Sequence, residues 1–204
     1  MEYLVTMTTH VPPGTSDEAV ADVRARESEH SAGLVADGRL LRLWRPPLQP
    51  GEWRTFGLFA DESDAALEQT LAGMPLRVWR TDEVTPLAPH PNDPAPARRG
   101  PRGALPEFFT TFTFRIPADA PTETVAARTA QEAARTRELA DAGTLARLWM
   151  LPDAAGERRA LGLWRAADAQ QLQAVLESLP VSAWLATEVV PLSPHPSDPA
   201  LAAG

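Results

Sequence analysis

The sequence predicts an α+β fold made of two copies of one strand-helix-strand-strand-helix-strand unit. The first observation is an internal repeat, because the chain shifted by 105 residues aligns with itself without a gap, and PLAPHPNDP near the middle matches PLSPHPSDP near the end. The second is that each copy alternates short segments of strand-like and helix-like periodicity. Together these observations indicate a duplicated α+β domain.

The first copy predicts its elements in order. Apolar and polar residues alternate along Glu2–His10, as in a half-buried strand. Ser16 is placed to cap a helix whose first turn holds Asp17 and Glu18 and which ends at Gly38. The remaining elements are expected as strand, strand, helix and strand: Arg39–Trp44, Trp53–Ala60, a helix from the cap Asp61 to Pro75, and Leu76–Val84.

The repeat divides the chain into two folded copies, residues 1–94 and residues 107–199. Residues 95–106 are rich in Pro, Gly, Ala and Arg and predict a linker, and residues 200–204 form a tail. Antiparallel strands with both helices on one face define the ferredoxin-like arrangement. The open sheet faces of two such copies can cover each other. We therefore expect an intrachain pseudo-dimeric α+β barrel.

Composition excludes several classes of function. The net charge of −8 argues against nucleic acid and anionic membranes as partners. No apolar run reaches the ~18 residues of a membrane span, so a cytoplasmic location is expected. The chain has neither cysteine nor lysine, which excludes thiolate and Schiff-base chemistry. No dinucleotide-binding, phosphate-loop or zinc motif occurs, so we expect neither a cofactor nor a metal.

One carboxylate is retained on an apolar helix face. At about 100° per residue, Glu27 shares that face with Val23 and Leu34. A carboxylate among apolar side chains is costly to ionise, which suits a general base or acid. His30 and Ser31 lie one turn further along, where His30 is placed to assist proton transfer and Ser31 to contact a substrate.

The alternative for Glu27 is structural: its carboxylate reaches solvent, or it pairs with Arg24 or with a strand arginine such as Arg42. In the second copy, Glu132 takes the same place, but Arg128 and Arg135 lie one turn to either side. These two arginines are expected to hold Glu132 ionised and to lower its pKa. We therefore expect the first copy to be catalytic, and the second to be structural, an anion site or a differently tuned site.

Two arginines of the second predicted strand, Arg42 and Arg45, are candidates for binding a substrate carboxylate. Trp44 lies between them and can line an apolar pocket, although core packing for the tryptophan and surface pairing for the arginines are the simpler roles. The second copy has Met150 in place of Arg45. The histidines of the two PHPxDP segments have no neighbouring metal ligands, and a proline-rich arm packed across the other copy explains them better.

The helix and strand AVADVRARESEHSAGLVADGRLLRLWR, together with the closing HP segment, resemble the muconolactone Δ-isomerase family. The likeness covers about 90 residues of the first copy and a more diverged second copy. Of the family's pattern, Glu27, Glu29 and the LWR end of the strand stand here. The resemblance implies a ferredoxin-like fold, dimeric barrel packing and higher assembly. It also implies a cofactor-free 1,3-proton shift in an unsaturated lactone.

These observations lead us to expect a cofactor-independent isomerase with Glu27 as general base and acid, assisted by His30, and with Arg42 or Arg45 on the substrate carboxylate. A cyclase, lyase or double-bond isomerase of secondary metabolism is the second hypothesis. A non-catalytic ligand-binding or assembly protein is the third. The expected partners are a small-molecule substrate and further copies of the fused chain.

Overall fold

A computed structural model describes residues 1–94 and 105–202, and it divides the chain into two compact units. Unit 1 comprises Met1–Leu87 and Ser193–Gly204, and unit 2 comprises Ala88–Leu192. The closing segment of each repeat therefore belongs to the unit that is built mainly from the other repeat. Most of the predicted linker, residues 95–104, and the last two residues of the predicted tail lie outside the described residues.

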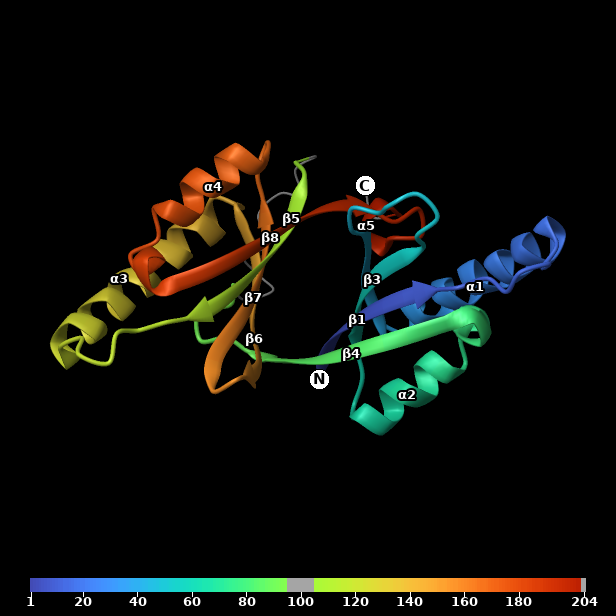
Figure 1. Ribbon diagram of the computed structural model, residues 1–204, viewed down its shortest axis with the longest axis horizontal. Coiled ribbons are helices and arrows are strands. Elements are labelled where there is room, and N and C mark those ends of the chain that lie inside the picture. Colours follow the sequence, from blue (N-terminus) through green and yellow to red (C-terminus); the bar gives the residue numbers. More distant parts are fainter. Residues whose placement is uncertain (95–104, 203–204) are drawn as a thin grey trace. The chain divides into compact units, whose positions relative to one another are not determined.

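Unit 1 follows the predicted order of elements (Figure 1), to which the structure adds a 3-10 helix, η1, and a short helix of the closing segment, α5. The bounds in chain order are β1 Glu2–Thr9, α1 Asp17–Ala36, β2 Leu40–Arg45, β3 Arg54–Ala60, α2 Asp64–Ala72, η1 Pro75–Trp79, β4 Arg80–Pro89 and α5 Pro199–Ala202.

The long helix of unit 1 begins and ends as its sequence predicts. The Ser16 hydroxyl accepts a hydrogen bond from the Ala19 amide at 3.2 Å, which caps one of the free N–H groups of the first turn. Gly38 follows the last turn with φ of +71°, a conformation that glycine adopts without steric cost. The chain can therefore turn directly from α1 into β2.

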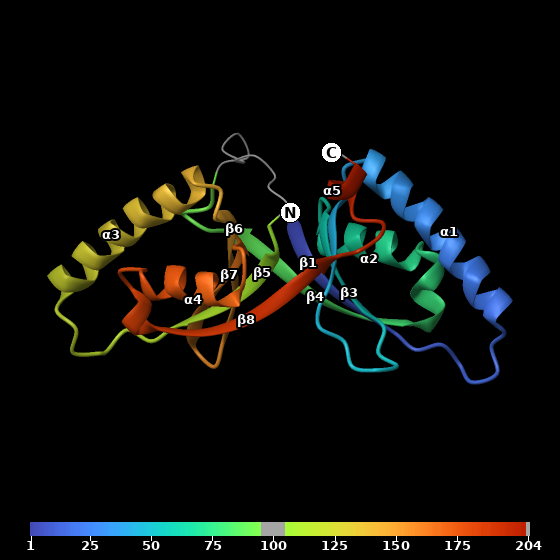
Figure 2. The same cartoon turned by 90° about the horizontal axis from the view of Figure 1, so that it is seen from above.

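The sheet of unit 1 is antiparallel, with β1 between β3 and β4, and β2 on the far side of β3. The end of β8 extends it, because Ser193 and Pro194 pair with Arg45 and Trp44. Both α1 and α2 cover the same side of these strands, as Figure 2 shows. The core between helices and strands includes the alternate residues Tyr3, Val5 and Met7, together with further apolar side chains of the sheet and helices, among them Leu34, Leu40, Phe59, Leu67 and Leu71.

Unit 2 repeats this plan. Its bounds are β5 Glu107–Phe114, α3 Thr122–Asp141, β6 Leu145–Ala154, β7 Glu157–Arg165, α4 Ala169–Glu177, η3 Ser182–Trp184 and β8 Leu185–Pro194. Its sheet is antiparallel, with β5 between β7 and β8 and β6 on the far side of β7. The end of β4 extends it, because Ala88 and Pro89 pair with Met150 and Trp149.

The expected fold class is confirmed. Each unit has the ferredoxin-like order and antiparallel sheet, and the order of strand pairing, β1-β3-β2-β8-β5-β7-β6-β4, closes on itself as in a barrel. The closing PHPxDP segments account for the two exchanged pairings, as the arm interpretation predicts.

Two local predictions in the first repeat were wrong. The second helix is capped by Ser63 rather than Asp61, whose carboxylate instead binds Arg39 at 2.7 Å and the Thr70 hydroxyl at 2.7 Å. The segment predicted as strand Leu76–Val84 begins as the 3-10 helix η1, and strand pairing starts only at Arg80. The alternating apolar residues of η1 imitate a strand, but only β4 finds a neighbouring strand to pair with.

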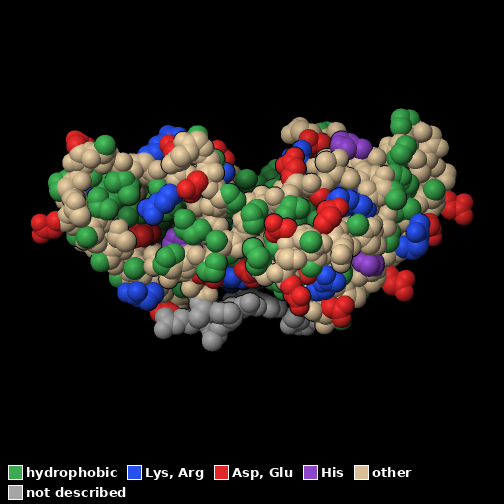
Figure 3. All heavy atoms as spheres, turned by 90° about the horizontal axis from the view of Figure 1, so that it is seen from below, with side chains coloured by type: hydrophobic (Ala, Val, Ile, Leu, Met, Phe, Trp, Pro, Cys, Tyr) green, Lys and Arg blue, Asp and Glu red, His purple; other side chains and the backbone are tan. Residues whose placement is uncertain are grey.

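Acidic and basic side chains are interspersed on the face drawn in Figure 3 rather than gathered into one charged patch. Within the residues that the structure describes, no helix is long and apolar enough to cross a membrane.

Candidate active site

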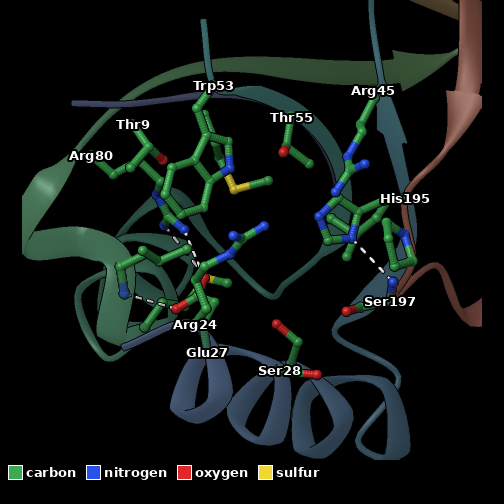
Figure 4. Close-up of a pocket in the computed structure, with 16 residues that line it drawn as sticks. Thr9, Arg24, Glu27, Ser28, Arg45, Trp53, Thr55, Arg80, His195 and Ser197 are labelled. Atoms are coloured by element: carbon green, nitrogen blue, oxygen red, sulfur yellow. Dashed lines mark hydrogen bonds and ion pairs between the residues drawn. The ribbon is translucent and has the colours of Figure 1, made fainter. Parts of the chain in front are cut away.

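Unit 1 contains a cavity of about 170 Å³ between α1 and the sheet. Four residues of α1 and the closing segment of the chain contribute charged and hydroxyl groups to its wall. Figure 4 shows these side chains converging from α1, from β2, from the region of η1 and β4, and from the closing segment. The polar lining residues are Thr9, Arg24, Glu27, Ser28, Ser31, Arg45, Thr55, Arg80, His195 and Ser197.

Glu27 occupies the cavity wall with both carboxylate oxygens in contact with donors. The Leu76 amide donates to Oε2 at 2.8 Å, and Arg80 Nη1 donates to Oε1 at 3.1 Å. The Glu27 side chain is 13% exposed and that of Arg80 only 2%. The ion-pair role left open for Glu27 is therefore realised, with a strand arginine that the sequence did not single out.

Arg80 is held between two carboxylates. Besides Glu27, it contacts Asp82, with Nε and Oδ1 2.6 Å apart, and the Asp82 side chain is 1% exposed. Asp82 also pairs with Arg77. Arg80 is therefore shared between Glu27 and a second, buried carboxylate. The Leu76 amide and Arg80 together hold the Glu27 oxygens in a fixed position at the cavity wall.

Two further guanidinium groups, those of Arg24 and Arg45, line the cavity. Arg24 lies 4.9 Å from the centre of the Trp53 ring, in a cation–π arrangement. Within the described ranges 1–94 and 105–202, neither Arg24 nor Arg45 forms an ion pair with Asp or Glu. In Figure 4, Arg24 lies near the centre of the lining residues, and Arg45 lies at the right of the view, beside His195. Such a pair of cations can bind a carboxylate or stabilise a developing oxyanion.

The closing segment brings His195 into the cavity wall. The Ser197 amide donates to His195 Nδ1 at 3.1 Å, which leaves Nε2 as the nitrogen that carries the hydrogen of the neutral ring. Burial, reinforced by the positive charges of Arg45 and Arg24, lowers the pKa of His195 to about 4, although Asp198 opposes the shift. His195 is therefore a neutral hydrogen-bond donor near neutral pH.

Asp198 anchors this segment. Its carboxylate, 1% exposed, accepts two hydrogen bonds from the Arg42 guanidinium at 3.0 Å and one from the Leu43 amide at 3.1 Å. The Arg42 guanidinium also lies 4.6 Å over the Trp44 ring. The PHPxDP motif thus has two functions, an aspartate that fastens the arm and a histidine that faces the cavity. The sequence repeat marked the motif but did not reveal which strand would receive it.

The structure brings only part of the predicted site together. Glu27, Ser31 and Arg45 line the cavity. Arg42 and Trp44 do not, since Arg42 binds Asp198 and Trp44 is fully buried.

His30 also lies away from the cavity. Its Cε1 atom is 3.8 Å from the position that a Cβ atom on Gly73 would occupy, at the end of α2. The groups not anticipated are Arg24, Ser28, Arg80 and His195. Arg24 lies about 60° from Glu27 around the helix, which is a signal that the sequence did contain, whereas Ser28 lies about 100° away.

Unit 2 contains the counterpart cavity, with a volume of about 430 Å³. Glu132 lies in its wall and accepts hydrogen bonds from the Val181 amide at 3.3 Å and from the Thr136 hydroxyl at 3.5 Å. Burial raises the pKa of Glu132, although the Val181 amide, Thr136 and the charge of Arg135 act in the opposite direction.

The expectation that Arg128 and Arg135 lower the pKa of Glu132 was therefore wrong. The Arg128 guanidinium lies 4.9 Å over the Trp184 ring and donates to the Pro180 carbonyl at 3.1 Å. Arg135 pairs with Glu138 at 2.9 Å. Helical spacing placed both arginines one turn from Glu132, but it could not predict which groups their long side chains would contact in the folded chain.

The closing segment of the first repeat acts on unit 2 as its counterpart does on unit 1. His90 lines the cavity, with Nδ1 accepting from the Asn92 amide at 3.0 Å, while Asp93 accepts from Arg147 at 3.2 Å and from the Leu148 amide at 2.6 Å. Burial and the charge of Arg158 lower the pKa of His90 to about 4. Each unit therefore has a carboxylate on its long helix and a neutral histidine on an arm from the other repeat.

The chain is thus a duplicated ferredoxin-like α+β protein, and each unit has a glutamate of its long helix in a cavity wall. The sequence profile of the family described as muconolactone delta-isomerase matches residues 1–93 and again residues 107–198. The chain therefore belongs to the muconolactone Δ-isomerase family, as a tandem duplication of its domain, and the resemblance predicted from the sequence is confirmed.

Individual relatives agree with this assignment. Muconolactone Delta-isomerase 1 of Acinetobacter lwoffii is 34% identical over 92 residues, which are 45% of this chain and 93% of that protein. The muconolactone Delta-isomerase of Cupriavidus pinatubonensis is 33% identical over 92 residues, 45% of this chain and 97% of that protein. A mutant chlorite dismutase from Candidatus Nitrospira defluvii has a TM-score of 0.62 at 12% identity, over 95% of this chain and 92% of its own, which shows the fold alone.

Proposed function

We propose that this protein is a cofactor-independent isomerase that moves a proton within a small unsaturated lactone or a related carboxylated substrate. The reaction takes place in the cavity of unit 1. The observation that carries the proposal is the position of the Glu27 carboxylate in a cavity that Arg24 and Arg45 also line, two cations that form no ion pair with Asp or Glu in the described residues. Family membership supplies the class of reaction, since the named relatives are isomerases of a lactone.

The chemistry requires one group that removes and returns a proton. Glu27 takes a proton from a carbon activated by the lactone carbonyl, the electrons of that C–H bond delocalise into a dienolate, and the protonated Glu27 returns the proton to another carbon of the conjugated system. One C–H bond breaks, another forms and the double bond moves. No electrons are gained or lost, and no further reactant is consumed.

The remaining lining groups fit the charges of this reaction. One of the two unpaired guanidinium groups binds the substrate carboxylate, and the other stabilises negative charge on the dienolate oxygen. The neutral His195 donates its Nε2 hydrogen to a substrate oxygen, because Nδ1 is already occupied by the Ser197 amide. Arg42 and His30 have no part in the proposal, because neither lines the cavity.

Incubation with muconolactone in deuterated water, followed by proton NMR, tests this function. The wild-type protein is expected to convert the lactone and to introduce deuterium at carbon. Glu27→Gln is expected to slow this conversion about 100-fold or more, the usual contribution of a general base. Glu29→Gln, an exposed change on the same helix, is the matched control and is expected to keep the wild-type rate.

Two outcomes contradict the proposal. A Glu27→Gln protein that converts the lactone at the wild-type rate removes the base from the mechanism. Complete absence of conversion and exchange by the wild-type protein contradicts the lactone substrate, and it favours different chemistry on another metabolite or a non-catalytic role.

A further inference from the structure

The cavity of unit 2 has diverged in chemistry as well as in size. It is about 430 Å³ against about 170 Å³ in unit 1, and aromatic side chains replace smaller or polar ones around it. Phe112 and Phe114 stand where unit 1 has Met7 and Thr9, and Trp164 stands where it has Phe59. The change in volume is large enough to alter which ligands fit, since a cavity of ~150 Å³ already accommodates benzene.

The cations of unit 1 have been removed at three positions. Shifted by 105 residues, Arg24, Arg45 and Arg80 correspond to Thr129, Met150 and Leu185. All three replacements line the cavity of unit 2. The loss of the Arg80 counterpart explains why Glu132 contacts only an amide and a hydroxyl, while Glu27 faces a guanidinium.

One cation has been added in return. Arg158 lines the cavity of unit 2 at the position of Trp53, and its guanidinium lies 5.7 Å from the centre of the Phe114 ring. Within the described part of the chain, Arg158 has no Asp or Glu in an ion pair. In unit 1 the arginine comes from the helix and lies over an aromatic side chain, as Arg24 does over Trp53. In unit 2 the arginine comes from a strand and lies beside a strand phenylalanine, as Arg158 does beside Phe114.

We propose that the cavity of unit 2 is a second ligand site of different specificity, which takes a ring-bearing, mainly apolar monocarboxylate larger than the substrate of unit 1. The ring lies among Phe112, Phe114, Trp164 and Trp184, and the carboxylate pairs with Arg158. In this placement most of the ligand surface packs against aromatic side chains, as is usual in small-molecule pockets. It does not depend on the reaction proposed for unit 1.

Glu132 and His90 set the polarity of the remaining wall. Burial raises the pKa of Glu132, and burial with the charge of Arg158 lowers that of His90 to about 4. The neutral imidazole of His90, whose Nδ1 accepts from the Asn92 amide, can donate from Nε2 to a carbonyl or hydroxyl of the ligand without adding a charge. Arg158 is then the cation that selects for an acid over the corresponding alcohol.

The chain carries natural reporters that distinguish the two sites. Its four methionines include Met7 and Met74 in the wall of the unit 1 cavity and Met150 in the wall of the unit 2 cavity. Ile116, which also lines the unit 2 cavity, is the single isoleucine of the sequence. Methyl labelling with carbon-13 at Met and Ile therefore yields separate signals for each cavity in the intact protein.

The test is a titration of this labelled protein with 2-naphthoate, with the neutral 2-naphthalenemethanol as the uncharged comparison. The expected result is that naphthoate shifts the Met150 and Ile116 methyl signals at lower concentration than it shifts those of Met7 and Met74. The alcohol is expected to bind about tenfold more weakly. Arg158→Met is expected to weaken naphthoate binding about tenfold while leaving binding of the alcohol unchanged.

Arg159→Met is the matched control, because Arg159 is the next residue of β7 and does not line the cavity. It is expected to bind naphthoate like the wild type, and the unchanged methyl spectrum of each free variant shows that it is folded. The proposal is overturned if Met7 and Met74 respond first, if no signal moves at millimolar ligand, or if Arg158→Met and Arg159→Met bind naphthoate equally well.

Discussion

At the scale of single residues, the two long-helix glutamates show how one neighbouring position changes the partners of a carboxylate. Glu27 and Glu132 occupy equivalent places, and each accepts a backbone amide hydrogen bond, from Leu76 and Val181 respectively. They differ because β4 supplies Arg80 to Glu27, whereas the equivalent residue of β8 is Leu185. Burial raises the pKa of Glu132. The cavity of Glu27 has more arginines in its wall, which suits it to an anionic ligand.

Arg80 is also predicted to contribute to stability. Arg80→Met leaves the buried Asp82 and the largely buried Glu27 without their shared counter-ion, so the free energy of unfolding is expected to fall by about 3 kcal/mol. Arg26→Met breaks an exposed pair with Asp22 and is expected to cost below about 0.5 kcal/mol. Urea denaturation of both variants measures the difference, and equal losses contradict a structural role for the buried pair.

At the scale of elements, the sequence predicted what local chemistry determines. The Ser16 cap, the glycine at the end of α1 and the alternation of β1 all depend on residues close in the chain, and each is found as expected. Predictions that depended on distant partners were less complete. Asp61 is a residue type favoured at helix N-caps, but Arg39 and Thr70 bind its carboxylate.

The candidate site was predictable to a similar degree. The helix period placed Glu27 and Ser31 on the face toward the sheet, and both line the cavity. The period could not identify Arg80 as the partner of Glu27, since the two are 53 residues apart in the chain. It also could not reveal that the arms would be exchanged, which brings His195 into a cavity formed mainly by the first repeat.

The arms lead to a prediction about pH. The pKa values of His90 and His195 are lowered to about 4 in the folded protein, from about 6.5 in the unfolded chain. Between pH 6.5 and 4 the unfolded histidines therefore bind protons that the folded ones do not, so the free energy of unfolding decreases as pH falls through this window. Above pH 6.5 both states are neutral at these positions, and below about pH 4 both are protonated.

Urea denaturation at pH 7.5 and pH 5 measures this effect. The double variant His90→Gln, His195→Gln is expected to lose less stability than the wild type between the two pH values. His10→Gln, a change at an exposed strand end, is expected to show the wild-type difference. A double variant that shows the full wild-type loss contradicts the assignment of this pH dependence to the arms.

At the scale of the whole molecule, duplication has produced two sites with a common plan and different contents. Both have a helix glutamate, an arm histidine and an anchoring aspartate. The cavity of unit 1 is smaller and is lined by more arginines, whereas that of unit 2 is larger and is lined by more aromatic side chains. The two cavities differ at positions 80 and 185, among others, and not because of the helix arginines of the second repeat. That the first copy is the catalytic one stays a prediction.

The central claim is that the proton shift takes place at Glu27. The most direct measurement compares Glu27→Gln and Glu132→Gln in the deuterium-incorporation assay with muconolactone, with turnover normalised to folded protein. We predict that Glu27→Gln lowers the rate about 100-fold or more, while Glu132→Gln stays within about twofold of the wild type. Equal losses in the two variants, or a larger loss in Glu132→Gln, would contradict it.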